Sequence, residues 1–180
     1  MIDTGPNARS LQINLNRFTL IGATTRQGDL SKPLRTRFTT TLRLDYYEEH
    51  VLAIIIKRSA MLLNVSLSNE AAEVIASRSR GTPRIANNLL KWVRDFSDVK
   101  SASRIDGTIA KAALDMLNID DIGLDEMDRR LLDVIISHYN GGPVGVNTLA
   151  TSLGEDTTTI EDVHEPYLIL KGFIQRTSRG

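Results

Sequence analysis

Three short stretches decide the fold of this sequence: FTLIGATTR at 18–26, PLRTRF at 33–38 and GTPR at 81–84. The first is a nearly continuous apolar run that ends in two hydroxyls, which predicts a strand buried on both faces over 18–23. The second places two arginines in a turn, and the third starts a helix with a proline and an arginine. Each can hold phosphate, yet the sequence contains no phosphate loop of the G-x-x-x-x-G-K-[ST] type.

The neighbouring segments extend this α/β beginning into a helical region. Alternating residues over 11–15 and β-branched residues over 39–44 predict two further strands. From residue 48 the apolar period becomes helical. Four helices are expected over this region. The first starts at 48, and the second covers 70–78 with Ser68 as its N-cap. The third has Thr82 as its N-cap and Pro83 at its first position, and the fourth runs from Asp106 to about 117.

A polar, turn-prone linker over 118–123 separates this region from a second helical unit. Apolar positions between 124 and 136 predict one helix, and two more are expected over 146–153 and 158–170. Phe173 to Thr177 reads as a strand. Three helices followed by a strand is the element order of a winged helix-turn-helix domain, in which the chain ends where the wing turns back.

Composition limits the class of protein. The chain has 180 residues, 41% of them hydrophobic, and no cysteine, so it can form no disulfide and no thiolate metal site. No apolar run approaches the length of a membrane span, so we expect no membrane association. Residues 1–118 carry 17 basic and 11 acidic side chains, or +6, whereas residues 119–180 carry 5 and 11, or −6. The basic part suits a phosphate ligand, and the acidic part argues against a DNA-binding assignment from charge alone.

Several side chains in these segments are candidates for phosphate chemistry. A hydroxyl at the end of a buried strand, as at Thr24 or Thr25, can hold a water or a phosphate oxygen; ordinary turn chemistry is the alternative. Arg35 and Arg37 could serve a phosphoryl group on a neighbouring subunit or be solvated surface arginines. Arg84 lies where the helix dipole disfavours a cation, so it needs an anion nearby, either a carboxylate or a phosphate.

Aromatic and basic residues elsewhere suggest further contacts. The Tyr46-Tyr47 pair could stack on a base or pack between subdomains. Arg176 and Arg179 frame the expected wing, where basic side chains would contact DNA phosphates; a polar turn is the alternative. The three histidines have no ligand-like spacing in the sequence, so no metal site is expected.

Taken together, the segments resemble the RuvB family, bacterial AAA+ motors of Holliday-junction branch migration. The matching segments occur in the family's order and cover essentially the whole chain: FTLIGATTR, PLRTRF, RGTPRIANNLL, VRDFSDVK, ALDMLN, GGPVG and TIEDVHEPYLILKGFIQRT. The resemblance implies the tail of an α/β P-loop-type AAA+ domain at 1–47, a small helical lid domain at 48–118 and a winged-helix head at 119–180.

The resemblance also implies roles for individual residues. Thr25 matches the sensor-1 residue that faces the γ-phosphate and attacking water, and Arg37 matches the arginine finger that acts on the neighbouring subunit's ATP. Tyr47 and Arg84 match ATP-contacting positions, Arg84 as sensor 2. Arg176 matches a DNA-contacting position in the head, whereas Arg179 stays a candidate from its place at the expected wing alone. The ribbon with Leu11 and Ile13 resembles the hairpin that grips RuvA.

The family further implies ATP as cofactor, with Mg²⁺ in the full-length enzyme, and a cytoplasmic homo-hexamer that acts on Holliday junctions and duplex DNA with RuvA and RuvC. The segments that hold Mg²⁺ and the phosphates lie upstream in the family, so this chain alone is expected to be inactive as an ATPase. Thr36 and Thr39 depart from the family's acid and glycine. Two alternatives remain open: a non-enzymatic winged-helix regulatory module, and another AAA+ ATPase of DNA replication.

Overall fold

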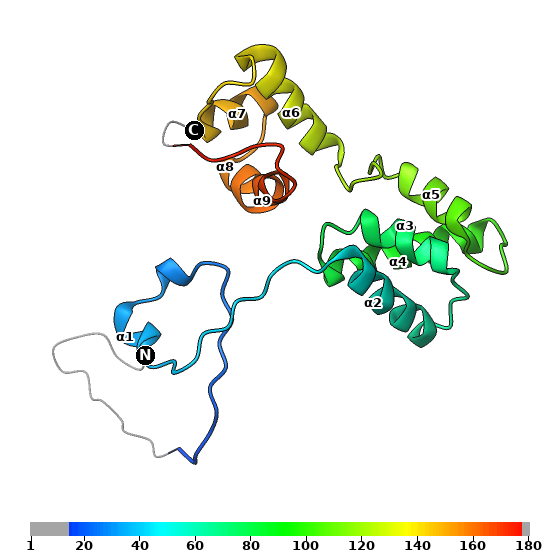
Figure 1. The fold of residues 1–180 in the computed structure, drawn as a ribbon, viewed down its shortest axis with the longest axis horizontal. Helices are drawn as coiled ribbons and strands as arrows, with labels where there is room; N and C mark the ends of the chain where they lie inside the picture. The colour runs from blue at the N-terminus through cyan, green and yellow to red at the C-terminus, as the bar shows by residue number, and fades with distance from the viewer. Residues whose placement is uncertain (1–14, 178–180) are drawn as a thin grey trace, which may run out of the picture. The chain divides into compact units, whose positions relative to one another are not determined.

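Helices dominate the part of the chain that the computed structural model describes, residues 15–177 (Figure 1). The chain divides into two units, Met1–Arg43 and Leu44–Gly180. Within the described residues of the first unit, the helical segments are a 3₁₀ turn, η1 (Gln27–Asp29), and a short helix, α1 (Lys32–Arg35). The described helical segments of the second unit are α2 (Glu49–Leu62), α3 (Asn69–Ser77), α4 (Pro83–Val99), α5 (Gly107–Asp115), α6 (Glu126–Tyr139), α7 (Val146–Leu153), α8 (Thr157–Thr159), η2 (Ile160–His164) and α9 (Glu165–Leu170).

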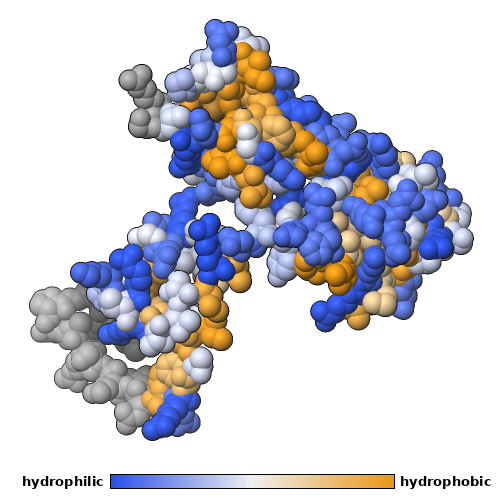
Figure 2. Space-filling view, viewed as in Figure 1, coloured by the Kyte–Doolittle hydropathy of each residue, from blue (hydrophilic) through white to orange (hydrophobic). Residues whose placement is uncertain are grey.

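The strands predicted at 18–23 and 39–44 are absent from the structure. Neither segment is assigned as a strand in the described part of the chain, and Phe18 and Ile21 are 68% and 87% exposed. A strand needs a second backbone for its N–H and C=O groups and an apolar layer for its faces. No adjacent strand supplies either among residues 15–177, where the one β pairing is an isolated parallel bridge between Leu67 and Ile105. Hydrophobic surface is accordingly exposed on this unit (Figure 2). The predicted strand at 11–15 lies almost wholly outside the described residues.

The α2–α5 group folds around one apolar core, as the sequence predicts. The helix starts at Ser68 and Asp106 are confirmed: Ser68 Oγ accepts the Ala71 N–H at 3.0 Å, and Asp106 Oδ1 accepts the Ile109 N–H at 2.9 Å. Thr82 is the N-cap of α4, but its hydroxyl donates to the Arg80 carbonyl and makes no capping bond. The core contains the following fully buried large side chains: Leu52, Ile56, Ile75, Leu90, Val93 and Leu114.

The α6–α9 group has a second core and departs from the predicted pattern at two places. The helix expected over 158–170 is interrupted by the π-helical segment η2. Pro166, the second residue of α9, lacks the N–H that a continuous α-helix would need at this position, which favours a wider turn before it.

The strand predicted at 173–177 does not form either. The Phe173 N–H donates to the Leu168 carbonyl at 2.9 Å, across a left-handed Gly172, and so completes the end of α9. The turn after α7 at Gly154 is confirmed, with φ of +70°.

Candidate functional site

Thr24 and Thr25 lie at the end of the segment in the first unit for which a strand was predicted. Thr24 Oγ1 accepts the backbone N–H of Arg26 at 3.0 Å, which fixes the turn, whereas the Thr25 side chain is exposed. One hydroxyl therefore holds the backbone and the next one is presented to solvent. The exposed Thr25 hydroxyl is therefore accessible to a ligand.

The arginine turn of the first unit is built by α1. The hydroxyl of Thr36 donates to the Pro33 carbonyl at 3.1 Å and so satisfies a carbonyl at the end of the helix. Thr36 thus has a local structural role. Arg37 is exposed, and within residues 15–177 its guanidinium has neither a hydrogen bond nor an ion pair.

Phe38 brings the threonine segment and the arginine turn together. A Cβ atom at Gly22 would lie 3.2 Å from Phe38 Cζ, so the ring packs directly on the glycine backbone. Gly22 precedes Thr25 by three residues and Phe38 follows Arg37 directly. The structure therefore brings the segments of Thr25 and Arg37 side by side within one unit.

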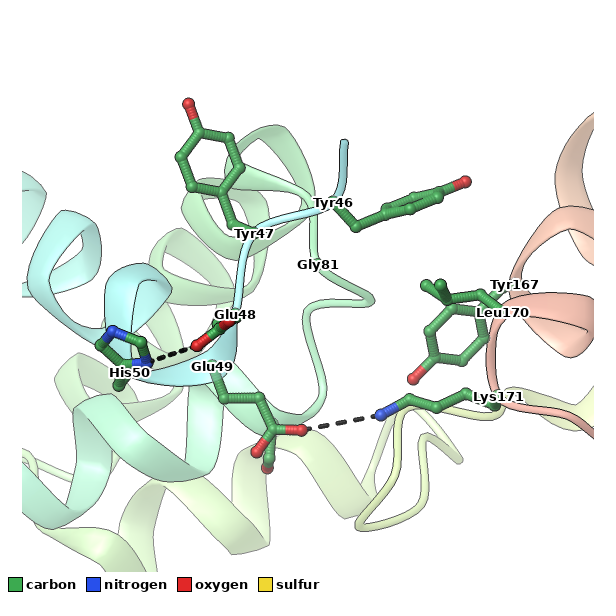
Figure 3. Close-up of a pocket in the computed structure, with 10 residues that line it drawn as sticks. Tyr46, Tyr47, Glu48, Glu49, His50, Gly81, Tyr167, Leu170 and Lys171 are labelled. Atoms are coloured by element: carbon green, nitrogen blue, oxygen red, sulfur yellow. Dashed lines mark ion pairs between the residues drawn. The ribbon is translucent and has the colours of Figure 1, made fainter. Parts of the chain in front are cut away.

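The second unit joins the tyrosine pair to the turn before α4. The Tyr47 N–H donates to the Gly81 carbonyl at 2.8 Å. Gly81 has φ of +67°, and a Cβ there would lie 2.7 Å from Tyr46 Cβ. Both features require glycine at 81. The rings of Tyr46 and Tyr47 are directed away from each other (Figure 3).

These tyrosines line an open cavity of about 330 Å³. Lys171 Nζ lies 3.6 Å from Glu49 Oε1 on its wall, and Glu48 pairs with His50 at 3.1 Å (Figure 3). The lining residues are Tyr46, Tyr47, Glu48, Glu49, His50, Ser77, Gly81, Tyr167, Leu170 and Lys171. The cavity combines aromatic faces with charges of both signs, but Arg84 is not part of it.

Arg84 is exposed in the first turn of α4, directly after Pro83. No carboxylate among residues 15–177 pairs with it, so the local partner that the sequence left open is not found there. A cation at the positive end of a 17-residue helix is disfavoured by about 0.3–1 kcal/mol unless an anion binds. Arg84 thus adds its own charge to an anion-attracting helix start.

Arg176, the predicted DNA contact, is held by acids of its own unit. Its Nε and Nη2 donate to the two carboxylate oxygens of Glu165 at 2.6 and 2.7 Å, and Nη2 lies 3.4 Å from Glu161. The hydrogen bonds and charge of Glu165 raise the pKa of Arg176. A phosphate would have to displace this bidentate pair. Arg179, Leu11 and Ile13 lie outside the described residues.

A buried ionic cluster around Arg80 was not predicted from the sequence. Its side chain donates to the Gly123 carbonyl at 2.8 Å, to Asp125 at 3.0 Å and to Asp128. Asp128 is fully buried and its Oδ1 lies 2.7 Å from His164 Nδ1. Asp125 and Asp128 also cap α6 reciprocally through their backbone N–H groups. The pairing of Asp128 with a residue 36 positions away leaves no periodic signal in a sequence.

The pKa shifts of Asp128 and His164 favour the charged forms of both side chains. Burial alone would raise the pKa of Asp128, but the His164 hydrogen bond, the Asp125 N–H and the Arg80 charge outweigh it and lower that pKa. The hydrogen bond to Asp128 raises the pKa of His164 above 6.5. Burial also raises the pKa of Tyr167, whose hydroxyl donates to the Ile122 carbonyl, to about 12.

The oxygen and nitrogen atoms of Asp125, Asp128 and His164 lie within 4.8 Å of one another, as metal ligands could. Arg80 already donates to both carboxylates, so a cationic side chain takes the place that a metal ion would need. The cluster is therefore an ion-pair network that joins α6, η2 and the turn before α4.

Arg78 makes a second connection from the same segment. It is 2% exposed and donates to Asp115 at 2.7 Å, to the Ile119 carbonyl at 2.9 Å and to Asp121. The hydrogen bond from Arg78 lowers the pKa of Asp121, and the charges of Lys111 and Arg78 lower it further. The segment 119–121 between α5 and α6 is thus bound to the residue that ends α3. Among the described residues no helix is both long and apolar enough to cross a membrane.

Known proteins match the chain along its length. Three family models match consecutive parts: the Holliday junction DNA helicase RuvB P-loop domain at 1–44, the RuvB AAA lid domain at 47–120 and the RuvB C-terminal winged helix domain at 121–180. The chain is 58% identical over its 180 residues to the Holliday junction branch migration complex subunit RuvB of Protochlamydia amoebophila. It is 54% identical over 179 residues to the subunit of the same name from Chlamydia trachomatis. It spans 54% of the length of each, about half.

Solved structures agree with these matches. The Thermotoga maritima RuvB Holliday junction branch migration motor is 55% identical, with a TM-score of 0.82 over 88% of this chain and 53% of that one. A single-substitution variant of it gives 0.85 over 95% and 57%, at 53% identity. The P-loop match supports the predicted α/β class for the first unit, although its described residues pair no strands. These matches, which together run from one end of the sequence to the other, show that the chain belongs to the RuvB family.

Proposed function

We propose that this chain supplies the nucleotide-sensing residues and the DNA-binding head of an ATP-driven motor for Holliday-junction branch migration in recombination and repair. The observation that carries the proposal is the exposed guanidinium of Arg84 at the start of α4, which has no partner among residues 15–177. The turn that precedes this helix binds Tyr47. A helix start with an added arginine is suited to a triphosphate. The proposed domains are residues 1–47, 48–118 and 119–180.

Each candidate residue has a task in this proposal. Thr25 orients the attacking water with its free hydroxyl, and Arg84 and Tyr47 contact the nucleotide of their own subunit. Arg37, exposed and unpaired among the described residues, reaches the neighbouring subunit's ATP and stabilises the negative charge on the transferring phosphoryl group. Such an arrangement needs a ring, and we propose a homo-hexamer.

The remaining contacts concern partners. Arg176 and Arg179 contact DNA phosphates, which position the head without reading sequence. Leu11 and Ile13 bind RuvA, and RuvC joins the complex at the junction. ATP is the cofactor, with Mg²⁺ held by segments of longer family members. Family membership favours the bacterial cytoplasm.

The isolated 180-residue chain should not hydrolyse ATP, since its sequence lacks the P-loop lysine that holds the phosphates. A direct test fuses the chain to the N-terminal half of the Protochlamydia amoebophila relative, which is 58% identical over the shared part. The chimera should hydrolyse ATP. Arg37→Ala should abolish turnover, by roughly 10³-fold or more, and keep ATP binding.

Arg35→Ala is the matched control, because it removes an exposed arginine from the same turn. Arg37→Ala subunits mixed with subunits that carry an inactive P-loop should regain part of the ATPase rate, since each then supplies what the other lacks. Unchanged turnover in Arg37→Ala would remove this residue from the mechanism. An inactive chimera that still binds DNA would favour a non-enzymatic winged-helix module.

A further inference from the structure

The turn between α3 and α4 has an unusual backbone. Arg80 has φ of +52° and Gly81 has φ of +67°, so two successive residues are left-handed. Glycine adopts this conformation freely, whereas for arginine it is sterically disfavoured. Such a conformation persists when the surrounding structure enforces it, and it is an observation from which a functional role can be inferred.

Contacts of the Arg80 side chain enforce this left-handed conformation. Nε donates to the Gly123 carbonyl, Nη2 donates to Asp125 and Asp128, and the guanidinium lies 4.9 Å from the centre of the Tyr167 ring. These contacts come from the segment before α6, from α6 itself and from α9. One arginine of the α2–α5 group is therefore inserted into the α6–α9 group, and its side chain is 12% exposed.

The acceptors of Arg80 are themselves fixed. Asp128 Oδ2 also accepts the Asp125 N–H at 3.0 Å, while Oδ1 faces His164 Nδ1 at 2.7 Å. The carboxylate thus has partners on both oxygens and cannot turn without breaking the start of α6. Arg80 is bound to a rigid acceptor and not to a mobile surface acid.

The turn that Arg80 fixes also carries the two nucleotide candidates of this unit. The next residue, Gly81, accepts the Tyr47 N–H, and Arg84 lies three residues after Gly81 in the first turn of α4. We propose that Arg80 is a positioning residue, which locks this turn onto the Asp128–His164 pair and thereby sets Tyr47 and Arg84 relative to the α6–α9 group. The nucleotide part of this inference rests on the proposed function.

The contact of Arg80 with the Asp128–His164 pair, here called the clamp, can be tested in the 180-residue chain by NMR. Because the Arg80 charge lowers the pKa of His164, Arg80→Gln should raise that pKa further, and the amide signals of Gly81 and Arg84 should shift. Arg94→Gln is the matched control: Arg94 pairs with its neighbour Asp95 on α4 and should leave both readouts unchanged. An unchanged His164 pKa in Arg80→Gln would overturn the clamp. Arg80→Lys keeps the charge if the glutamine variant fails to fold; it should preserve the wild-type His164 pKa while the Gly81 amide shifts.

The positioning role is tested by ATPase kinetics in the chimera. If Arg80 acts through Arg84, Arg80→Gln should raise KM for ATP roughly two- to thirtyfold and should have no further effect in an Arg84→Gln background. Additive effects would overturn the positioning role. If Arg84→Gln alone changes nothing, the proposed function of Arg84 fails, whereas the clamp is still decided by the His164 titration.

Discussion

The backbone N–H of Tyr47 donates a 2.8 Å hydrogen bond to the carbonyl oxygen of Gly81. This bond ties the segment that enters α2 to the turn that precedes α4, two places 34 residues apart in the sequence. It forms because Gly81 adopts a left-handed conformation and leaves room for Tyr46 beside it. The geometry of both tyrosines therefore depends on one residue that has no side chain.

Gly81→Ala should destabilise the chain by about 2–4 kcal/mol, because the new methyl group meets both an unfavourable φ and the Tyr46 Cβ. Urea unfolding followed by circular dichroism measures the loss. Gly141→Ala is the matched control, since Gly141 has φ of +70° but open space around it, and it should cost only about 1 kcal/mol. Equal losses at the two positions would show that the contact with Tyr46 contributes nothing.

The stability of the second unit should have an optimum in mildly acidic solution. The pKa of His164 is raised on folding, so its contribution is complete below pH 6.5 and is lost as the pH rises through the folded value. The pKa of Asp128 is lowered, so its contribution is present above pH 3.8 and is lost as the pH falls through the folded value. Asp125, Arg80 and Tyr167 face the same pair. The urea concentration at the midpoint of unfolding should therefore decrease as the pH rises above 6.5. His164→Gln should remove this decrease.

Asp128→Asn should cost about 3–5 kcal/mol, because it leaves Arg80 and His164 without their buried carboxylate. It should also bring the His164 pKa below its ordinary value, since burial then acts without its counter-ion. Thermal unfolding and the NMR titration of His164 measure the two effects. Asp133→Asn, an exposed acid on the same helix, should change neither. A His164 pKa that stays high in Asp128→Asn would contradict the assignment of this pair.

Glu165→Gln should strengthen binding to duplex DNA by about two- to fivefold at low ionic strength, because it weakens the bidentate pair that holds Arg176. Fluorescence anisotropy with a short duplex measures the change. Glu126→Gln alters the net charge equally from an exposed position on α6 without touching Arg176. If both variants gain equally, the effect is one of overall charge and Arg176 is not involved.

Local signals predict the helices well. Ser68 and Asp106 are recognisable caps because a short polar side chain satisfies an N–H three residues away. Such an interaction can be recognised within a short stretch of sequence. The end of α7 at Gly154 is equally local. Predictions of this kind need no knowledge of what lies next to the helix.

The sequence predicts poorly whatever depends on a distant partner. The apolar run at 18–23 has the composition of a central strand, but a strand exists only beside another one. Arg80, Asp128 and His164 are separated by 48 and 36 positions, so the buried cluster was invisible, and His164 looked like an isolated histidine. Arg84 and Arg37 were candidates from their local sequence and received specific roles from the family resemblance, whereas the exposure of their charges is information that only the structure adds.

The extended segment at 18–21 has a consequence for handling the protein. Its main-chain groups have no strand partner among residues 15–177, and its apolar side chains are open to water. A backbone in this state is a template for intermolecular β-pairing. Concentrated samples should therefore self-associate through this segment, and a lysine in place of Ile21, a gatekeeper charge on the open edge, should keep them dispersed.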